Sequence, residues 1–150
     1  MTHTAIHDIV ADCQTGENPA VVARMKSGWA VMGRKQVLPG YCLLLPDPVV
    51  PTLNDLTGDT RAQFLHDMGR LGDAILAATD AVRINYEMLG NAEPALHAHL
   101  FARYAHEHPT LATRPIWAYA WDEAPDFGDD ASLTLLDNIR RALNEPRHIF

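Results

Sequence analysis

The stretch PALHAHLFARY, residues 94–104, decides the fold, because its side chains alternate with the two-residue period of a β-strand. One face carries small apolar side chains, and the opposite face carries His97, His99, Phe101 and Arg103. On a strand, two histidines in His-x-His spacing lie roughly 7 Å apart along the backbone. Both imidazoles can therefore reach one ligand.

The residues before this stretch predict a partner strand and a long helix. VRINYEML, residues 82–89, alternates with the same period, and the short turn GNAEP favours its pairing with 95–103. Residues 60–79 place apolar side chains at helical spacing, with Asp59 or Thr60 as the expected cap. We therefore expect a hairpin that follows a long helix.

The remaining elements complete an α+β prediction. Apolar runs between glycines and prolines predict three strands before the long helix, and an amphipathic pattern predicts a helix near the end. We expect an antiparallel sheet with one long helix and a C-terminal helix packed on it. The predicted segments are a helical turn at the start, strands in 20–24, 28–36 and 40–48, a proline-rich loop in 46–59, an extended piece in 115–121, and a helix in 132–143.

Length and composition predict one domain, residues 1–150, with an ordinary hydrophobic core. The chain is 47% hydrophobic and 21% charged, and its net charge of -7 argues against a nucleic acid polymer as partner. It has no apolar run long enough to cross a membrane and no secretory pattern at its start, so we expect no membrane association and a cytoplasmic location. Cys13 and Cys42 lack the CxxC spacing of a thiolate zinc site.

Three interpretations of His97 and His99 remain open from the residues alone. The two histidines can be half-exposed residues without a function. They can be two ligands of a metal ion, since neutral imidazole is a common ligand, although no spacing marks a third. They can also carry out nucleophilic chemistry, in which a neutral imidazole attacks an electrophilic phosphorus.

A resemblance to a known family favours the third interpretation. INYEMLGNAEPALHAHLFARY, residues 84–104, resembles the signature region of bacterial histidine triad (HIT) proteins, whose motif alternates histidines with apolar residues after an asparagine-bearing strand and a Gly-Asn turn. Residues 12–46 look like the N-terminal half of the same domain. The resemblance covers residues 12–104, and 105–150 correspond to a variable C-terminal extension.

The resemblance implies roles for individual residues. Family members act at the α-phosphate of nucleoside phosphoramidates or dinucleoside polyphosphates, and their middle histidine becomes nucleotidylated. By this resemblance His97 is the nucleophile, His99 binds the phosphate, and Ala95 stands where the first histidine would be, which predicts reduced turnover. The remaining residues expected to contact substrate are Asn85, Gly90, Asn91, Gln36 and Arg103.

The same resemblance implies a homodimer that pairs through the long helix and part of the sheet. We expect it to bind a purine nucleotide or dinucleotide, with no cofactor or metal held by the protein and with magnesium accompanying a polyphosphate substrate. Two alternatives remain. One is a HIT-fold nucleotide-binding protein with little or no turnover, and the other is a His-x-His metal-binding protein.

Overall fold

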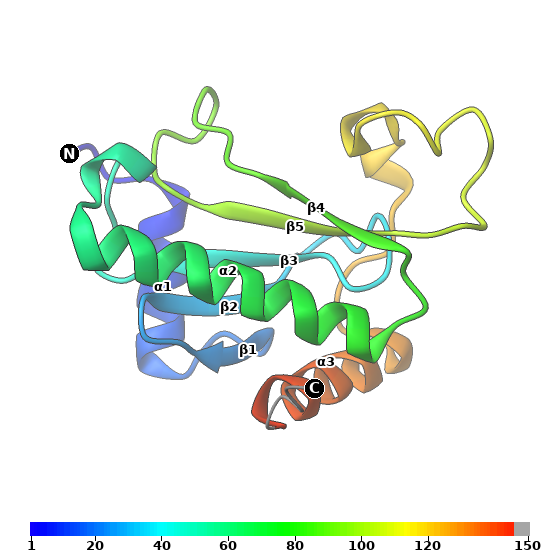
Figure 1. Cartoon of the computed structure of the whole chain (residues 1–150), viewed down its shortest axis with the longest axis horizontal. Coiled ribbons are helices and arrows are strands. Elements are labelled where there is room, and N and C mark those ends of the chain that lie inside the picture. The colour runs from blue at the N-terminus through cyan, green and yellow to red at the C-terminus, as the bar shows by residue number, and fades with distance from the viewer. Residues whose placement is uncertain (146–150) are drawn as a thin grey trace.

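The computed structural model describes residues 1–145, in which an antiparallel sheet of five strands runs in the order β1-β2-β3-β5-β4 (Figure 1). Three α-helices and three short 3-10 helices complete this part of the chain. The strands are β1 (Val21–Arg24), β2 (Gly28–Met32), β3 (Cys42–Pro46), β4 (Arg83–Glu87) and β5 (Ala98–Arg103). The helices are α1 (Ala5–Thr15), η1 (Leu53–Asp55), α2 (Gly58–Ala78), η2 (Ile116–Ala118), η3 (Trp121–Glu123) and α3 (Asp130–Asn144).

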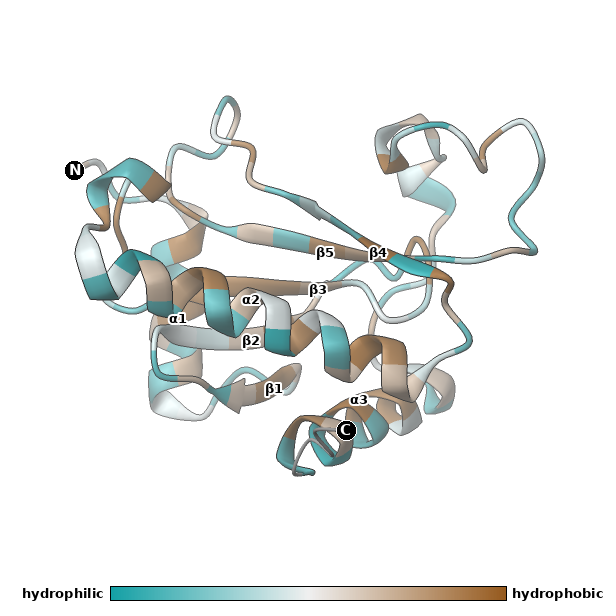
Figure 2. Cartoon of the chain, in the orientation of Figure 1, coloured by the Kyte–Doolittle hydropathy of each residue, from teal (hydrophilic) through white to brown (hydrophobic). Residues whose placement is uncertain are grey.

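The strand β5 follows His97 and contains His99, and it is paired with β3 on one side and β4 on the other. His99 lies opposite Leu43 on β3 and opposite Glu87 on β4. All six residues of β5 are buried, and hydrophobic residues concentrate in β3 and β5 (Figure 2). A strand that is covered on both faces can present polar side chains only to a site or to buried partners.

Helices cover both faces of the sheet. The long helix α2 buries Phe64, Leu71 and Ile75 in the main core, on the face that carries Leu44 and Leu100. The helix α1 lies on the other side of the sheet from α2 in Figure 1. It buries Ile6, Val10 and Cys13 in a second apolar cluster, which also contains Val31, Leu45 and Ala95.

The structure confirms the predicted sheet, long helix and C-terminal helix, and it corrects three details. The start of the chain is a complete helix of 11 residues rather than a helical turn. The helix α2 begins at Gly58 with Thr57 at its N-cap, two or three residues before the predicted cap, because the Thr60 hydroxyl accepts a hydrogen bond from the Thr57 amide.

The third correction concerns residues 115–121, for which the prediction of an extended segment was wrong. This segment forms the 3-10 helices η2 and η3, in which the amides of Ala118 and Tyr119 bond to carbonyls three residues back. No strand pairs with this segment in the described chain, so its amides find partners locally. Residues 146–150 of the predicted extension lie outside the described residues.

None of the helices in residues 1–145 has the length and hydropathy needed to cross a bilayer.

Candidate functional site

His97 stands directly before β5, and its ring orientation is set by a backbone carbonyl. Its Nδ1 lies 2.7 Å from the carbonyl oxygen of Ala95, and only 5% of the residue is exposed. A carbonyl can only accept, so Nδ1 carries the proton and donates it. In the neutral ring, Nε2 is therefore left with a lone pair, which is the form that can attack an electrophile.

His99 is the next side chain on the same face, and it is held among aromatic rings. Its ring centroid lies 4.7 Å from that of His97, and it stacks on Tyr41 and Phe101. The residue is 8% exposed, and its Nδ1 lies 2.7 Å from the Tyr41 hydroxyl. Burial, and to a lesser extent the neighbouring His97, lower the pKa of His99 to about 4. His99 is thus neutral at pH 7.

This low pKa predicts a pH dependence of folding stability. The pKa of an unfolded histidine is about 6.5, so between pH 6.5 and 4 the unfolded chain binds a proton that folded His99 does not. The contribution of neutral His99 to the free energy of unfolding is complete above pH 6.5. It is lost as the pH falls to 4, and the loss amounts to up to about 3 kcal/mol. Urea unfolding at several pH values should show that His99→Gln reduces this loss. If wild type and variant lose stability in parallel over this range, His99 does not cause the dependence.

A pocket of about 330 Å³ opens beside His97. Its walls come from the segment after β4, from the loop between β3 and α2, and from the residues that lead into β5. None of its lining residues is a lysine or arginine. The lining residues are Pro51, Thr52, Leu53, Asn54, Met88, Leu89, Gly90, Ala95, Leu96 and His97.

The structure brings some of the predicted substrate residues to this region. Gly90 lines the pocket, and Asn91 is the next residue of the same exposed turn. Asn85 pairs with Phe101 across β4 and β5, which places it on the sheet face that carries His97 and His99, hereafter the histidine face.

Arg103 occupies the far end of the histidine face, where its charge is already used. Its guanidinium donates to both carboxylate oxygens of Glu107, the nearest at 2.9 Å, and to the carbonyls of Leu111, Ala112 and Arg114. The side chains of this pair are 7% and 2% exposed. We therefore correct the expected substrate contact of Arg103 to a structural role: it fixes the segment that follows β5.

The buried ion pair is strengthened by further donors. Burial works against the ionised carboxylate of Glu107. Hydrogen bonds from Arg103, from the Tyr119 hydroxyl and from the Tyr104 amide outweigh burial and lower the pKa of Glu107. Burial and the hydrogen bond to Glu107 raise the pKa of Tyr119 to about 12. Both ends of the 104–119 segment are thereby tied to one carboxylate.

Gln36 does not face the pocket. Its amide nitrogen donates to the carbonyls of Gly33 and Tyr41, at 2.8 and 3.0 Å, and its amide oxygen accepts from the Gly40 amide. Both N–H groups and one lone pair of the oxygen of this buried side chain are used by the backbone. We correct its expected contact with the nucleotide to support of the turn that leads into β3.

Ala95 takes part through its backbone. Its side chain is 1% exposed and lies in the apolar cluster under α1, with Ile6, Val10 and Leu45. A methyl group suits this environment, whereas an imidazole there would need both space and a polar partner. The position therefore supplies a carbonyl to His97 and no polar side chain to the pocket.

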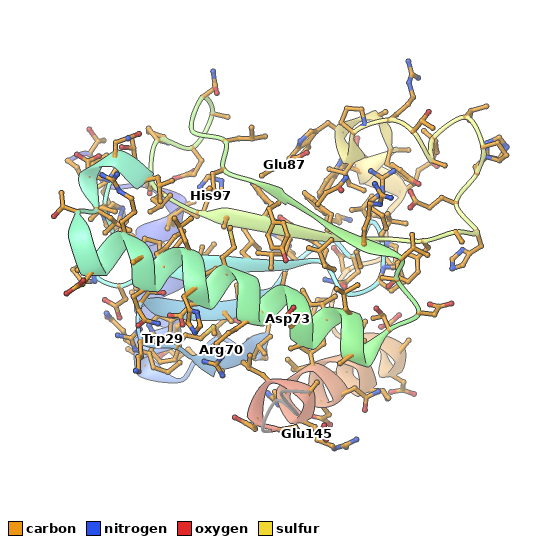
Figure 3. The ribbon with its side chains drawn as sticks, viewed as in Figure 1. Trp29, Arg70, Asp73, Glu87, His97 and Glu145 are labelled. Carbon is orange, nitrogen blue, oxygen red and sulfur yellow. The ribbon has the colours of Figure 1, made fainter. Side chains whose placement is uncertain are left out.

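Three residues near the histidines were missed by sequence reasoning. Tyr41 bonds to His99, and the Trp117 ring lies 5.5 Å from that of His99 and donates from its indole to Glu87 at 2.6 Å. Glu87 lies opposite His99 on the neighbouring strand, and Figure 3 labels Glu87 on β4 and His97 just before β5. The alternation that places His99 also places Glu87, so register alone could have found it. Trp117 is 44% exposed and lies outside the strands, so the strand register does not indicate that it lies near His99.

The third ligand that a metal site would need beside His97 and His99 is not found among the described residues. In residues 1–145, no group of three histidine, cysteine, aspartate or glutamate side chains is placed to hold an ion. The Nδ1 atoms of both histidines are occupied by Ala95 and Tyr41, which leaves only their Nε2 atoms as possible ligands.

Comparisons with known proteins identify the fold. No protein-family model matches the chain, and no curated protein matches it significantly. Solved structures do match. A histidine triad protein of Sinorhizobium meliloti is 20% identical, with a TM-score of 0.71, and one of Bradyrhizobium japonicum is 22% identical, with a TM-score of 0.70. Each match covers 87% of this chain and 94% of the other protein.

A third match comes from an archaeon. A hypothetical histidine triad nucleotide-binding protein of Sulfolobus tokodaii is 15% identical, with a TM-score of 0.70 and 91% coverage of both chains. At these identities the likeness concerns the backbone arrangement. The TM-scores and the coverage of both chains lead to one conclusion: this chain has the fold of the histidine triad proteins.

Proposed function

We propose that the protein is a nucleotide-binding hydrolase or transferase that acts at the α-phosphate of a purine nucleoside phosphoramidate or dinucleoside polyphosphate through a nucleotidylated His97. The observation that carries the proposal is the hydrogen bond from His97 Nδ1 to Ala95, which leaves the Nε2 lone pair free beside an open pocket. The described function of the Sulfolobus tokodaii protein, nucleotide binding, agrees with this assignment.

The proposed reaction has two displacements. In the first, the Nε2 lone pair of His97 forms a bond to the α-phosphorus, and the bond from phosphorus to the leaving nitrogen or oxygen breaks. The leaving group departs with a proton from solvent. In the second, water attacks the same phosphorus, the bond to Nε2 breaks, and the nucleoside monophosphate is released. Splitting one displacement into two lowers the barrier of each.

Charge near the pocket favours the phosphoramidate over the polyphosphate. The pocket has no lysine or arginine in its lining, and Arg103 is neutralised by Glu107. A polyphosphate leaving group carries several charges that such a site cannot balance. An amine leaving group needs no cationic partner.

The proposal is tested by following release of AMP from adenosine 5′-phosphoramidate and from diadenosine tetraphosphate. In parallel, the reaction is stopped in alkaline denaturant, because a phosphorus bond to imidazole is labile in acid. Mass spectrometry should then find one nucleotidyl group on the peptide that contains His97. If calorimetry shows that AMP binds but neither turnover nor a modified peptide is found, the proposal of an enzyme is wrong. The alternative, a nucleotide-binding protein without turnover, then holds.

We also propose that the protein forms a homodimer through the β4 edge and α2. The outer edge of β4 has no neighbour in the described sheet, and exposed apolar side chains gather there, including Val82 at 59% and Tyr86 at 41%. Sedimentation should give a dimer that Val82→Lys weakens by at least about tenfold. Leu133→Lys, at an exposed leucine of α3, should leave the dimer intact. A monomer at micromolar concentration contradicts the proposal.

A further inference from the structure

Within residues 1–145, the hydroxyl of Tyr41 makes one hydrogen bond, and its partner is His99 of the site. Tyr41 is 5% exposed, and within residues 1–145 the only hydrogen-bond partner of its hydroxyl is Nδ1 of His99, at 2.7 Å. Tyr41 comes directly before β3, which is the strand that pairs with β5. The hydroxyl and the imidazole therefore meet across two neighbouring strands, without a flexible loop between them.

The direction of this hydrogen bond follows from burial. If His99 donated from Nδ1, the Tyr41 hydroxyl proton would have no acceptor in the described chain, and a buried donor without a partner costs about 1–3 kcal/mol. If Tyr41 donates, both groups are satisfied. Nδ1 of His99 is then the acceptor, and the proton of the neutral ring must be on Nε2.

The surroundings of Tyr41 fix its ring for this contact. The ring stacks on Phe101, with centroids 4.4 Å apart and an interplanar angle of 19°. Gly33 leaves room for it, since a Cβ at this position would lie 2.2 Å from the tyrosine ring. The backbone amide of Gly33 and the side-chain amide of Gln36 both donate to the Tyr41 carbonyl, at 2.9 and 3.0 Å. The aromatic ring and the backbone of Tyr41 are thus held separately.

His97 and His99 consequently differ in their protonated nitrogen. His97 donates from Nδ1 to Ala95 and keeps a lone pair on Nε2. His99 accepts at Nδ1 and keeps a proton on Nε2. A phosphoryl group needs a lone pair directed at phosphorus and a donor directed at a non-bridging oxygen, where charge develops during attack. Two adjacent rings with opposite tautomers supply one of each.

We propose that Tyr41 is a positioning residue, which holds His99 as its Nε2–H tautomer so that this histidine donates to the phosphoryl oxygen while His97 attacks phosphorus. The tautomer of His99 follows from the hydrogen bond between Tyr41 and His99 and from the burial of Tyr41 alone. Its use in catalysis rests on the proposed function. Gln36 and Gly33 support the same arrangement from behind, through the backbone and ring of Tyr41.

The experiment combines spectroscopy with kinetics on the full chain. Long-range proton–nitrogen correlation spectra of ¹⁵N-labelled protein at pH 7 distinguish the two tautomers, with the signals assigned from His97→Ala and His99→Gln. In wild type we expect Nδ1–H for His97 and Nε2–H for His99. In Tyr41→Phe, which keeps the stacked ring, the His99 Nδ1 signal should move to the position of a nitrogen without a hydrogen-bond donor.

Turnover of adenosine 5′-phosphoramidate by Tyr41→Phe should fall about tenfold in kcat, with KM changed less than twofold, since only a contact of the transition state is weakened. Tyr104→Phe is the matched control, because it removes a hydroxyl that bonds to the Pro39 carbonyl instead of to a histidine. The control should keep both the His99 signals and kcat.

Either of two results overturns the proposal: a proton on Nδ1 of His99 in wild type, or an unchanged Nδ1 signal and kcat in Tyr41→Phe. Failure of the proposed function gives a different pattern, in which wild type lacks turnover altogether. The nitrogen spectra then decide by themselves whether Tyr41 sets the tautomer of His99. A fold lost in Tyr41→Phe leaves the wild-type tautomer as the deciding measurement.

Discussion

Replacing His97 with alanine is expected to reduce AMP release from adenosine 5′-phosphoramidate by at least about a thousandfold, while AMP binding changes by less than about tenfold. The ring supplies the only nucleophile of the proposed mechanism, and removing a nucleophile costs far more than removing one stabilising donor. Binding is expected to persist because the pocket walls come mainly from other segments, including Leu53, Met88 and Gly90. The measurement pairs single-turnover kinetics with calorimetric titration.

His66→Ala is the control for this variant. His66 is an exposed histidine on α2, outside the pocket beside His97, so its removal should leave kcat unchanged. Turnover by His97→Ala within about tenfold of wild type would show that water or another group attacks phosphorus directly. Equal losses in both variants would point to a general effect on the fold.

Glu107→Gln should lower the free energy of unfolding by about 3–5 kcal/mol. The substitution keeps the shape of the side chain but removes the charge that compensates the buried guanidinium of Arg103. It also turns one acceptor oxygen into a donor, facing a site where Arg103, Tyr119 and the Tyr104 amide all donate. Urea unfolding followed by far-ultraviolet circular dichroism measures the loss.

An exposed ion pair provides the comparison. Asp126 pairs with Lys35 at 3.1 Å, but their side chains are 62% and 36% exposed. Asp126→Asn should therefore change stability by less than about 1 kcal/mol. If Glu107→Gln costs no more than this control, the segment after β5 is held by packing, and the ion pair contributes little.

Much of the fold could be predicted because its strands follow simple alternation. The period of residues 96–103 fixes which side chains share a face, and it correctly separates His97 and His99 from Leu100. The apolar patterns also predicted the long helix and the antiparallel sheet, the resemblance named the histidine triad family, and the solved structures confirm that fold. Local pattern and overall fold agree in this part of the chain.

The roles that could not be predicted depend on contacts that sequence patterns do not indicate. Tyr41 and His99 are 58 positions apart, and nothing in the sequence indicates which hydroxyl reaches an imidazole across two strands. Arg103 was expected at the substrate because it shares a face with the histidines. Its actual partner, Glu107, lies in the irregular segment after β5, where no helical or strand periodicity indicates which side chains lie close together. The same lack of periodicity explains the wrong prediction for 115–121.

The carbonyl of Ala95 has a consequence for how such a strand can evolve. Every residue type has this oxygen, so the acceptor that orients His97 does not depend on which side chain stands at position 95. A chain with alanine in place of the first histidine therefore keeps the orientation of the nucleophile, while the small side chain packs in the apolar cluster under α1. A search pattern that requires three histidines would discard such a chain, whereas one that requires the strand geometry around the middle histidine would retain it.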